Sequence, residues 1–319
     1  MGSEYNNISC FIYKINENQD KQTIDYYAYF EKTPFSEGSF RYCYKGEIRD
    51  KNNKFSKSYI FPSGKCVVKV FKQKVAHYLS DFKEDFRNTF YSIKVSELFN
   101  SLYSSSCSKL HFNSAYATSL YKHSAFELFG FIPIRDSDSM MKIKENEWLA
   151  IEPFLDGKYE KFVSNTCLYY IDMPDETIPF FMHWNWVYSK GESIISDFQG
   201  IKKGNYYELT DPAVQSINGE YGEADLGTYG LLAFLIRHKH NQYCKDLPWP
   251  KDEDFERLNN VISNLDIKKV RKTTFIFNIL KEYNIKKEQF DEIYFYLKDC
   301  AFNKKQVKKQ DKKKKCIIF

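Results

Sequence analysis

The stretch "SDFQGIKKGNYYELTDP", residues 196–212, decides how the rest of the chain is interpreted. Its "DFQG" resembles D-F-G, the magnesium motif of ordinary protein kinases, but the H-R-D-L-x-x-x-N motif that should precede it is missing. Asp197, Gln199, Asp211 and an upstream lysine, Lys69, would still supply a carboxylate for an acceptor hydroxyl, oxygen ligands for Mg²⁺ and a cation for phosphates. Taken singly, each has an ordinary explanation, because a strand lysine usually faces water and Asp-Pro usually forms a turn.

Strand and helix patterns surround this stretch. Segments 25–30, 40–48 and 66–72 are rich in aromatic and β-branched residues and are separated by turn residues, which predicts strands. Apolar residues recur at helical spacing in 81–103, which predicts a long helix, and 148–155 is typical of a buried strand. This order is typical of a small lobe that holds a nucleotide against a larger one, with the site in the cleft between them.

The larger part of the chain is expected to be mixed. Segment 183–200 is predicted to be a hairpin that turns at Lys190-Gly191. Segment 226–238 is predicted to be a helix, with Asp225 as a candidate N-cap, and 251–300 has a helical pattern.

Composition places the chain among globular proteins. Its 319 residues suffice for one two-lobed domain or two ordinary ones, and 18% of them are aromatic. The eight cysteines lack the spacing of a disulfide framework, no apolar signal region precedes them, and no run of about 18 apolar residues exists. We therefore expect a reducing, cytoplasmic location and no bilayer span.

The net charge of +5 originates in the C-terminal tail. Residues 304–316, "KKQVKKQDKKKKC", hold eight lysines and one aspartate, and the chain stops at "CIIF". This is a C-a-a-X pattern whose final Phe favours geranylgeranylation of Cys316. One isoprenoid binds membranes only marginally, but each lysine near an anionic leaflet adds about 1 kcal/mol. We therefore expect a prenyltransferase substrate on the cytoplasmic face of a membrane, in preference to a nucleic-acid-binding tail.

A cluster of possible metal ligands lies in "RHKHNQYC", residues 237–244. By spacing alone, His238, His240 and Cys244 are either part of a metal site or a polar helix end with a stray thiol. Zinc needs three or four ligands, and this short stretch offers three. Residues i and i+2 do not share a helical face, so the two histidines converge only if the helix ends there.

The chain resembles the α-kinases, the atypical family that includes myosin heavy chain kinases, the elongation-factor kinase and the kinase domains of certain channels. The matching stretches occur in family order: "PFSEGSFRYCYKG" (34–46), "CVVKVFK" (66–72), "IEPFLDGKYEKFVSN" (151–165), "FMHWNW" (181–186), "DFQG" (197–200), "LTDP" (209–212), "GEADLGTYG" (222–230) and "HKHNQYC" (238–244). The resemblance implies an α+β, two-lobed protein-kinase-like fold with a structural zinc in the large lobe. It also implies an ATP-dependent kinase acting on Ser or Thr of protein substrates.

The resemblance implies roles for residues of the small lobe. Lys69 would hold the ATP phosphates, Arg41 would lie on the phosphate-facing loop, and Glu152 would lie on the hinge that contacts adenine. A carboxylate partner for Lys69 is expected on the long helix, where Glu97 is the candidate.

In the large lobe, Asp197 would be the catalytic carboxylate, while Gln199 and Asp211 would ligate Mg²⁺. The family's glycine-rich loop, associated with peptide substrate, would contain Asp225, Gly227 and Gly230. Asn is common at the Asp225 position, so the aspartate either alters substrate preference or caps the following helix.

Family members also bind a structural zinc through a histidine on an F-x-H strand and a His-x-Cys-x-x-x-Cys run. His183, His238 and Cys244 match three of these ligands. His240 stands where the family usually has Cys, and because imidazole is also a good zinc ligand, a His₃Cys site is chemically sound.

We divide the chain into an N-terminal extension (1–24), an α-kinase domain (25–250, with lobes at 25–150 and 151–250), a helical appendage (251–300) and the tail (301–319). Segment 101–147 is expected to form an insertion or loops, and 251–300 either packs on the large lobe or docks a partner. A pseudokinase that binds nucleotide or a partner is the alternative, although retention of all four phosphoryl-transfer residues argues against it. A small GTPase is excluded because G-x-x-x-x-G-K-[ST] is missing.

Overall fold

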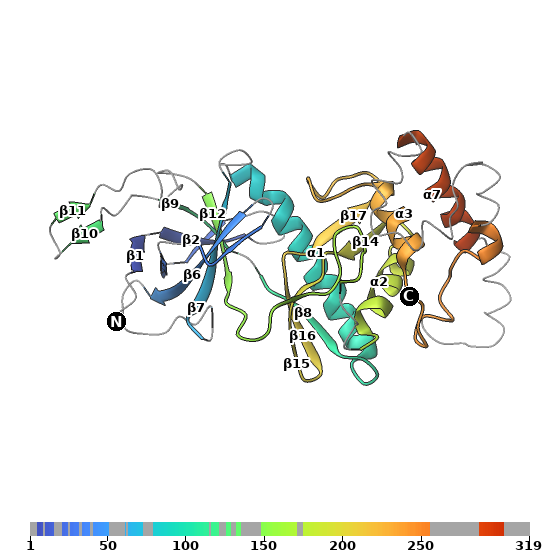
Figure 1. Cartoon of the computed structure of the whole chain (residues 1–319), viewed down its shortest axis with the longest axis horizontal. Coiled ribbons are helices and arrows are strands. Elements are labelled where there is room, and N and C mark those ends of the chain that lie inside the picture. The colour runs from blue at the N-terminus through green and yellow to red at the C-terminus, as the bar shows by residue number, and fades with distance from the viewer. Residues whose placement is uncertain are drawn as a thin grey trace. The chain divides into compact units, whose positions relative to one another are not determined.

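The computed structural model separates into two compact units (Figure 1). Unit 1 comprises residues 1–94 and 112–157, and unit 2 comprises residues 95–111 and 158–319. The structure describes residues 5–8, 10–15, 21–24, 26–31, 34–38, 41–50, 61, 63–72, 79–114, 116–120, 126–128, 132–134, 148–170, 175–255 and 287–302. The cysteine and lysines of the predicted tail lie outside these ranges.

Unit 1 is built on a nine-stranded antiparallel sheet in the order β1-β4-β6-β7-β12-β9-β2-β3, with β5 paired to β6. Its strands are β1 (Tyr5–Ile8), β2 (Cys10–Ile15), β3 (Lys21–Ile24), β4 (Tyr26–Glu31), β5 (Ser36–Glu37), β6 (Arg41–Asp50), β7 (Lys65–Phe71), β9 (Tyr116–Leu120) and β12 (Trp148–Pro153). A separate hairpin joins β10 (Phe126–Leu128) to β11 (Ile132–Ile134).

The centre of this sheet is apolar. Tyr44, Val68, Val70 and Ile151 belong to one buried cluster, which explains why β6, β7 and β12 form where aromatic and β-branched residues predicted strands. The three strands predicted around 25–30, 40–48 and 66–72 and the buried strand at 148–155 are confirmed.

Two segments differ from the expectation. The first 24 residues, expected to be an extension, contribute β1, β2 and β3 to the sheet of unit 1. Segment 101–147, expected to be loops, contains β9, whose residues pair with both β12 and β2. Strand β2 pairs with β9, which is distant from it in the chain, and a pairing of this kind leaves no local pattern in the sequence.

The predicted long helix is confirmed as α1 (Leu79–Tyr103), drawn in cyan in Figure 1. Phe82 and Phe86 are buried in its first part, and Phe99 is buried in its last part. Phe99 contacts the rings of Phe180 and Phe181, at centroid distances of 5.3 and 5.0 Å, within unit 2.

In the described ranges, unit 2 contains two small sheets and several helices. The four-stranded sheet has the order β13 (Glu160–Lys161), β15 (Gln199–Lys203), β16 (Tyr206–Thr210) and β8 (Lys109–Phe112), and β14 (Ser193–Ser196) pairs with β17 (Ala213–Ser216). The helices are α2 (Thr177–Tyr188), α3 (Thr228–Arg237) and α7 (Lys287–Phe302). No helix within the described ranges combines the length and the apolarity that a bilayer crossing demands.

The hairpin predicted for 183–200 is half wrong. Thr177–Tyr188 is helical, whereas the turn at Lys190-Gly191 is present, with positive φ at both residues, and β14 follows it. Ten of the twelve residues of α2 are buried, so the segment is apolar on every side and lacks the one-sided period that marks a surface helix. Its run of aromatic residues therefore matched the pattern expected of a buried strand.

Candidate active site

Asp197 and Asp211 lie at matching breaks between two pairs of strands. Ser196 pairs with Ala213 at the end of one hairpin, and Gln199 pairs with Thr210 at the start of the next. The aspartates occupy the gaps between these pairs, and both have a left-handed backbone, with φ of 58° and 48°. Few residues other than glycine adopt this conformation, and it is concentrated at functional sites where the surrounding structure enforces it.

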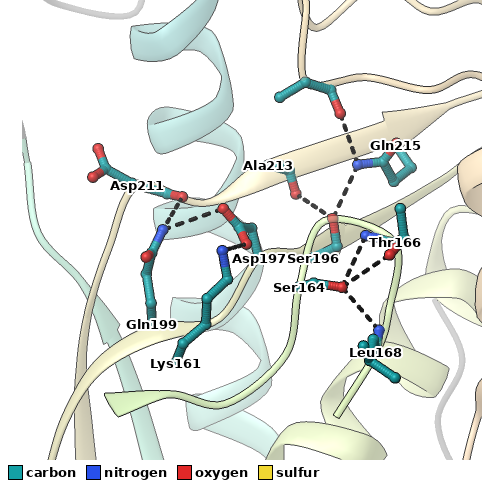
Figure 2. A network of polar contacts seen from close by, with 11 residues as sticks. Lys161, Ser164, Thr166, Leu168, Ser196, Asp197, Gln199, Asp211, Ala213 and Gln215 are labelled. Carbon is teal, nitrogen blue, oxygen red and sulfur yellow. Dashed lines mark hydrogen bonds and ion pairs between the residues drawn. The ribbon is translucent and has the colours of Figure 1, made fainter. Parts of the chain in front are cut away.

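Gln199 connects the two breaks. Its Nε2 donates to Asp197 Oδ2 over 3.2 Å and to the main-chain oxygen of Asp211 over 3.4 Å (Figure 2). The Asp211 carboxylate points away from Asp197 in the same view. The Gln199 carbonyl is also turned away from Asp197, because its amide nitrogen faces that carboxylate. The Asp211 carboxylate and the Gln199 side-chain carbonyl, which are hard oxygen ligands of the kind that Mg²⁺ prefers, therefore point away from the Asp197 carboxylate, which is expected to meet the acceptor.

Gly200, next to Gln199, allows β15 to approach β16 closely. A Cβ at position 200 would lie 2.0 Å from the main-chain oxygen of Glu208 on β16, and the residue has a φ of 149°. Only glycine permits this approach between β15 and β16.

Lys161 is the cation beside the catalytic candidate, and the sequence interpretation did not single it out. It lies opposite Gln199 in the β13–β15 pair, and its Nζ is 2.8 Å from Asp197 Oδ1 (Figure 2). Burial raises the pKa of Asp197, the Lys161 ammonium opposes that rise, and the nearby Asp211 charge adds to it. The lysine falls within the family-like stretch 151–165, which was the available signal.

Lys69 forms a buried ion pair in unit 1. Its Nζ on β7 is 2.8 Å from Glu152 Oε2 on β12, and both side chains are about 5% exposed. Ala150 lies directly opposite Lys69, so Glu152 reaches it diagonally across the strand pair. The predicted partner, Glu97, is instead an exposed residue of α1. A buried lysine needs a nearby charge, and a carboxylate on the neighbouring strand supplies it without any contribution from the helix.

Arg41 is the first residue of β6. Its guanidinium pairs with Asp85 of α1 and lies 4.5 Å from the centre of the Phe71 ring. The exposed stretch 34–38 precedes it and is closed by a hydrogen bond from Gly38 N to the Arg41 oxygen, 2.8 Å long. The described part of the expected phosphate-facing loop, 34–38, is therefore attached to Arg41 by this hydrogen bond.

The glycine-rich loop is attached to β17 by two side chains. Asp225 accepts hydrogen bonds from Ser216 N, Ser216 Oγ, Tyr221 N and Gly227 N, with lengths from 2.6 to 3.2 Å. It does not cap α3, because the residue before that helix is Gly227, at a φ of 66°. The N-cap prediction is therefore wrong, since the carboxylate is engaged in closing the loop.

Gln215 provides the second attachment. Its Nε2 donates to Ser196 Oγ and to the Ala224 oxygen, both over 3.0 Å (Figure 2). Its Oε1 accepts from Leu226 N over 2.7 Å. A Cβ at Gly230 would lie 2.3 Å from Gln215 Oε1, so glycine is needed there for α3 to approach. This buried amide links the loop to the residue that precedes Asp197, a connection that no local pattern indicated.

The four predicted metal ligands lie together in unit 2. The ligand atoms of His183, His238, His240 and Cys244 are all within 4.8 Å of one another. Cys244 Sγ is 3.6 Å from His238 Nε2 and 3.8 Å from His240 Nδ1, close to the separation of about 3.5 Å that tetrahedral zinc geometry gives. The helix α3 ends at Arg237, so the condition for the convergence of His238 and His240 is met.

The surroundings of the cluster suit a metal. His183 Nε2 donates to the Pro248 oxygen over 2.9 Å, which leaves a buried Nδ1 without a hydrogen-bond partner in the described ranges. Asn241 N donates to Cys244 Sγ over 3.1 Å. Burial lowers the pKa of His183 to about 3, so its imidazole is neutral, as a metal ligand must be. His183 lies on α2 and not on the predicted strand.

Much of the chain is similar in sequence to known proteins. Residues 36–244 match the model of the Alpha-kinase family. The Dictyostelium discoideum alpha-protein kinase vwkA is 37% identical over 112 residues, which are 34% of this chain and 18% of that protein. This chain spans between 5% and 18% of the length of the curated relatives it matches.

The fold is also similar to that of solved structures. An alpha kinase from Entamoeba histolytica superposes with a TM-score of 0.57 and 23% identity, covering 76% of this chain and 92% of the solved one. The alpha-kinase domain of myosin heavy chain kinase A in complex with ADP gives a TM-score of 0.55 and 20% identity, covering 76% and 96%. At these identities, the agreement shows a common fold.

Proposed function

The chain belongs to the alpha-kinase family, and from that membership we propose that it is a kinase that transfers phosphate from ATP to Ser or Thr of protein substrates. The observation that carries the proposal is the arrangement of Asp197, Gln199 and Asp211 at the two strand breaks, with Lys161 beside the first carboxylate. A scaffold that only binds a partner has no need for two strained aspartates in register.

Nucleotide binding is assigned to the residues of unit 1. The related domain of myosin heavy chain kinase A was solved with ADP, which supports a nucleotide ligand for this fold. Lys69 would contact the ATP phosphates, and Glu152 would hold its ammonium in one position before ATP arrives. Arg41, which is held by Asp85 and Phe71, would support the phosphate-facing turn.

Asp197 is assigned to the acceptor. The Ser or Thr oxygen forms a bond to the γ-phosphorus while the bond to the β,γ-bridging oxygen breaks and ADP leaves. Asp197 orients the hydroxyl, accepts its proton and releases it to solvent. Burial raises the pKa of this carboxyl, which favours proton acceptance, and Lys161 keeps it ionised. When bound, Mg²⁺ neutralises charge on the phosphates, and Gln199 and Asp211 would hold it.

A structural zinc is included in the proposal. The support is the convergence of His183, His238, His240 and Cys244, together with the buried Nδ1 of His183, which has no hydrogen-bond partner among the described residues. Four protein ligands would leave no open coordination position, so the role would be structural.

Membrane attachment is also included, with its support in the sequence. The eight lysines of 304–316 and Cys316 would together provide the electrostatic and lipid signals that stable peripheral binding requires, on the cytoplasmic face. A prenyltransferase and anionic lipid would then be partners in addition to the protein substrates.

Phosphate transfer is the direct test. Labelled Mg-ATP would be incubated with basic Thr-containing peptides and with the protein itself, using the wild type, Asp197→Ala, Asp211→Ala and the matched exposed control Asp156→Ala. We expect transfer by the wild type and the control and its loss in both site variants, with nucleotide binding retained by Asp197→Ala. Nucleotide binding without transfer in the wild type would replace the proposal with the pseudokinase.

A further inference from the structure

Helix α7 lies outside the family match and packs on unit 2 beside α3 (Figure 1). The Phe290 ring lies 5.7 Å from the Tyr229 ring of α3. The side of α7 that faces the unit is buried at Phe290, Ile293, Tyr294, Leu297 and Ala301. Segment 251–300 therefore ends in a helix that completes the apolar core of unit 2.

One polar contact joins α7 to the start of α3. The Thr228 hydroxyl donates to Asp291 Oδ1, and Thr228 is the first residue of α3, directly after the loop 222–227. The Asp291 carboxylate also lies near the amino end of α3, where a negative charge is favourable to the helix dipole. A half-buried charged hydrogen bond thus holds the junction between loop and helix.

A second contact joins α7 to the strand that leads to Asp197. Trp186 Nε1 donates to Tyr294 Oη over 3.0 Å, and that hydroxyl donates to the Gly191 oxygen. Gly191 forms the turn between α2 and β14, and β14 ends one residue before Asp197. The helix is therefore attached to both segments that the proposed reaction uses.

We propose that α7 is a positioning helix for the peptide-substrate loop and that Asp291 acts on the loop through Thr228. This inference rests on the proposed kinase function, and it assigns the appendage to acceptor binding and not to ATP binding. The apolar contacts of α7 provide stability, whereas the Asp291–Thr228 hydrogen bond restrains the direction in which the loop enters α3.

Steady-state kinetics of the full chain test the role of Asp291. Asp291→Asn should raise the KM for a basic Thr-containing peptide about three- to tenfold and leave the KM for Mg-ATP unchanged, because a neutral amide oxygen accepts a weaker hydrogen bond from Thr228 than the carboxylate does. The matched control is Asp299→Asn, since Asp299 is an exposed residue of the same helix. Thr228→Val should reproduce the effect, Thr228→Ser should behave as wild type, and Asp291→Asn combined with Thr228→Val should add nothing further.

Hydrogen exchange gives a readout that does not depend on turnover. Amides 222–231 should exchange faster in Asp291→Asn than in Asp299→Asn, with no change at 196–203. An unchanged peptide KM and unchanged loop exchange in Asp291→Asn would overturn the inference alone. A wild-type protein that transfers no phosphate would overturn the proposed function and with it this role. If Asp291→Asn is less stable than the wild type, the comparison of Thr228→Ser with Thr228→Val still tests the hydrogen bond, because only the valine lacks the hydroxyl.

Discussion

Asp197 combines three features that rarely occur together in one residue. It has a left-handed backbone, it is largely buried, and its carboxylate contacts both an ammonium and an amide. The left-handed backbone costs stability, and burial of the carboxylate costs further free energy unless the ammonium and the amide are both present. Such a residue persists because the strand pairings on both sides enforce its position, and the same constraint holds it ready for an acceptor hydroxyl.

Asp175 has the opposite electrostatic balance. Burial raises its pKa, but hydrogen bonds from Lys202, Ser108 and Thr177 outweigh burial and lower the pKa from 3.8 to about 2. Tyr207 Oη also donates to this carboxylate over 3.0 Å. A folded-state pKa below the unfolded value stabilises the protein above pH 3.8, and the contribution is lost as the pH falls towards 2.

Asp175→Asn should therefore lower the free energy of unfolding by roughly 1–2 kcal/mol at pH 7. Urea titrations followed by Trp fluorescence at pH 7, 4 and 3 would measure the difference from wild type, which should shrink at the lowest pH. Asp156→Asn is the control, because its carboxylate is 81% exposed and lies 3.9 Å from Lys65. A difference that is independent of pH would contradict the assignment.

At the level of elements, the cluster of four candidate metal ligands lies where three segments of unit 2 meet. His183 comes from the middle of α2, His238 follows α3, and Cys244 lies in the segment that leads to Pro248. Trp249 covers the group, with its ring 4.5 to 5.1 Å from the three imidazoles. A metal at this point would hold α2, α3 and the following segment together.

Cys244→Ser is expected to lower both the zinc content and the melting temperature of the protein. Removing one of four ligands weakens structural zinc binding, and the binding free energy contributes to folding. Elemental analysis and thermal melts with and without a chelator would measure the two effects. Cys107→Ser is the matched control, because Cys107 lies outside the cluster. Equal zinc content and melting in the wild type and Cys244→Ser would exclude the zinc site.

At the level of the whole molecule, each unit uses segments that are distant in sequence. The sheet of unit 1 takes strands from the first residues and from β12, and unit 2 is completed by α7 near the other end. The catalytic candidates are divided in the same way, with Lys69 and Glu152 in unit 1 and Asp197 in unit 2. Truncation near either end would therefore remove structure from a unit.

Membrane association through Cys316 and the neighbouring lysines is the part of the proposal that concerns the whole molecule. Cys316→Ser should move the protein from the membrane fraction to the soluble fraction, because lysines alone bind anionic lipid weakly and reversibly. Fractionation of cells that express the full chain would measure this change, with Cys300→Ser of α7 as the control. If Cys316→Ser stays in the membrane fraction, the lipid part of the proposal is wrong. The kinase activity of Cys316→Ser in solution should equal that of the wild type.

The sequence by itself determined the chemical groups and several of the elements that carry them. It singled out Lys69, Asp197, Gln199, Asp211 and the four candidate metal ligands, because the short stretches that carry them resemble α-kinase motifs and a motif is a local property. The β7 strand and α1 were identifiable for the same reason, because their apolar periods are visible within a few turns or residues.

Only the tertiary structure decided which groups are partners. The pairing of Lys69 with Glu152, the ion pair of Lys161 with Asp197 and the attachment of Asp291 to Thr228 each join residues that are distant in the chain. Strand order and register set these pairings, and a single sequence contains no local period that encodes them. The helix α2 escaped prediction for a related reason, because complete burial removed the contrast between its two sides.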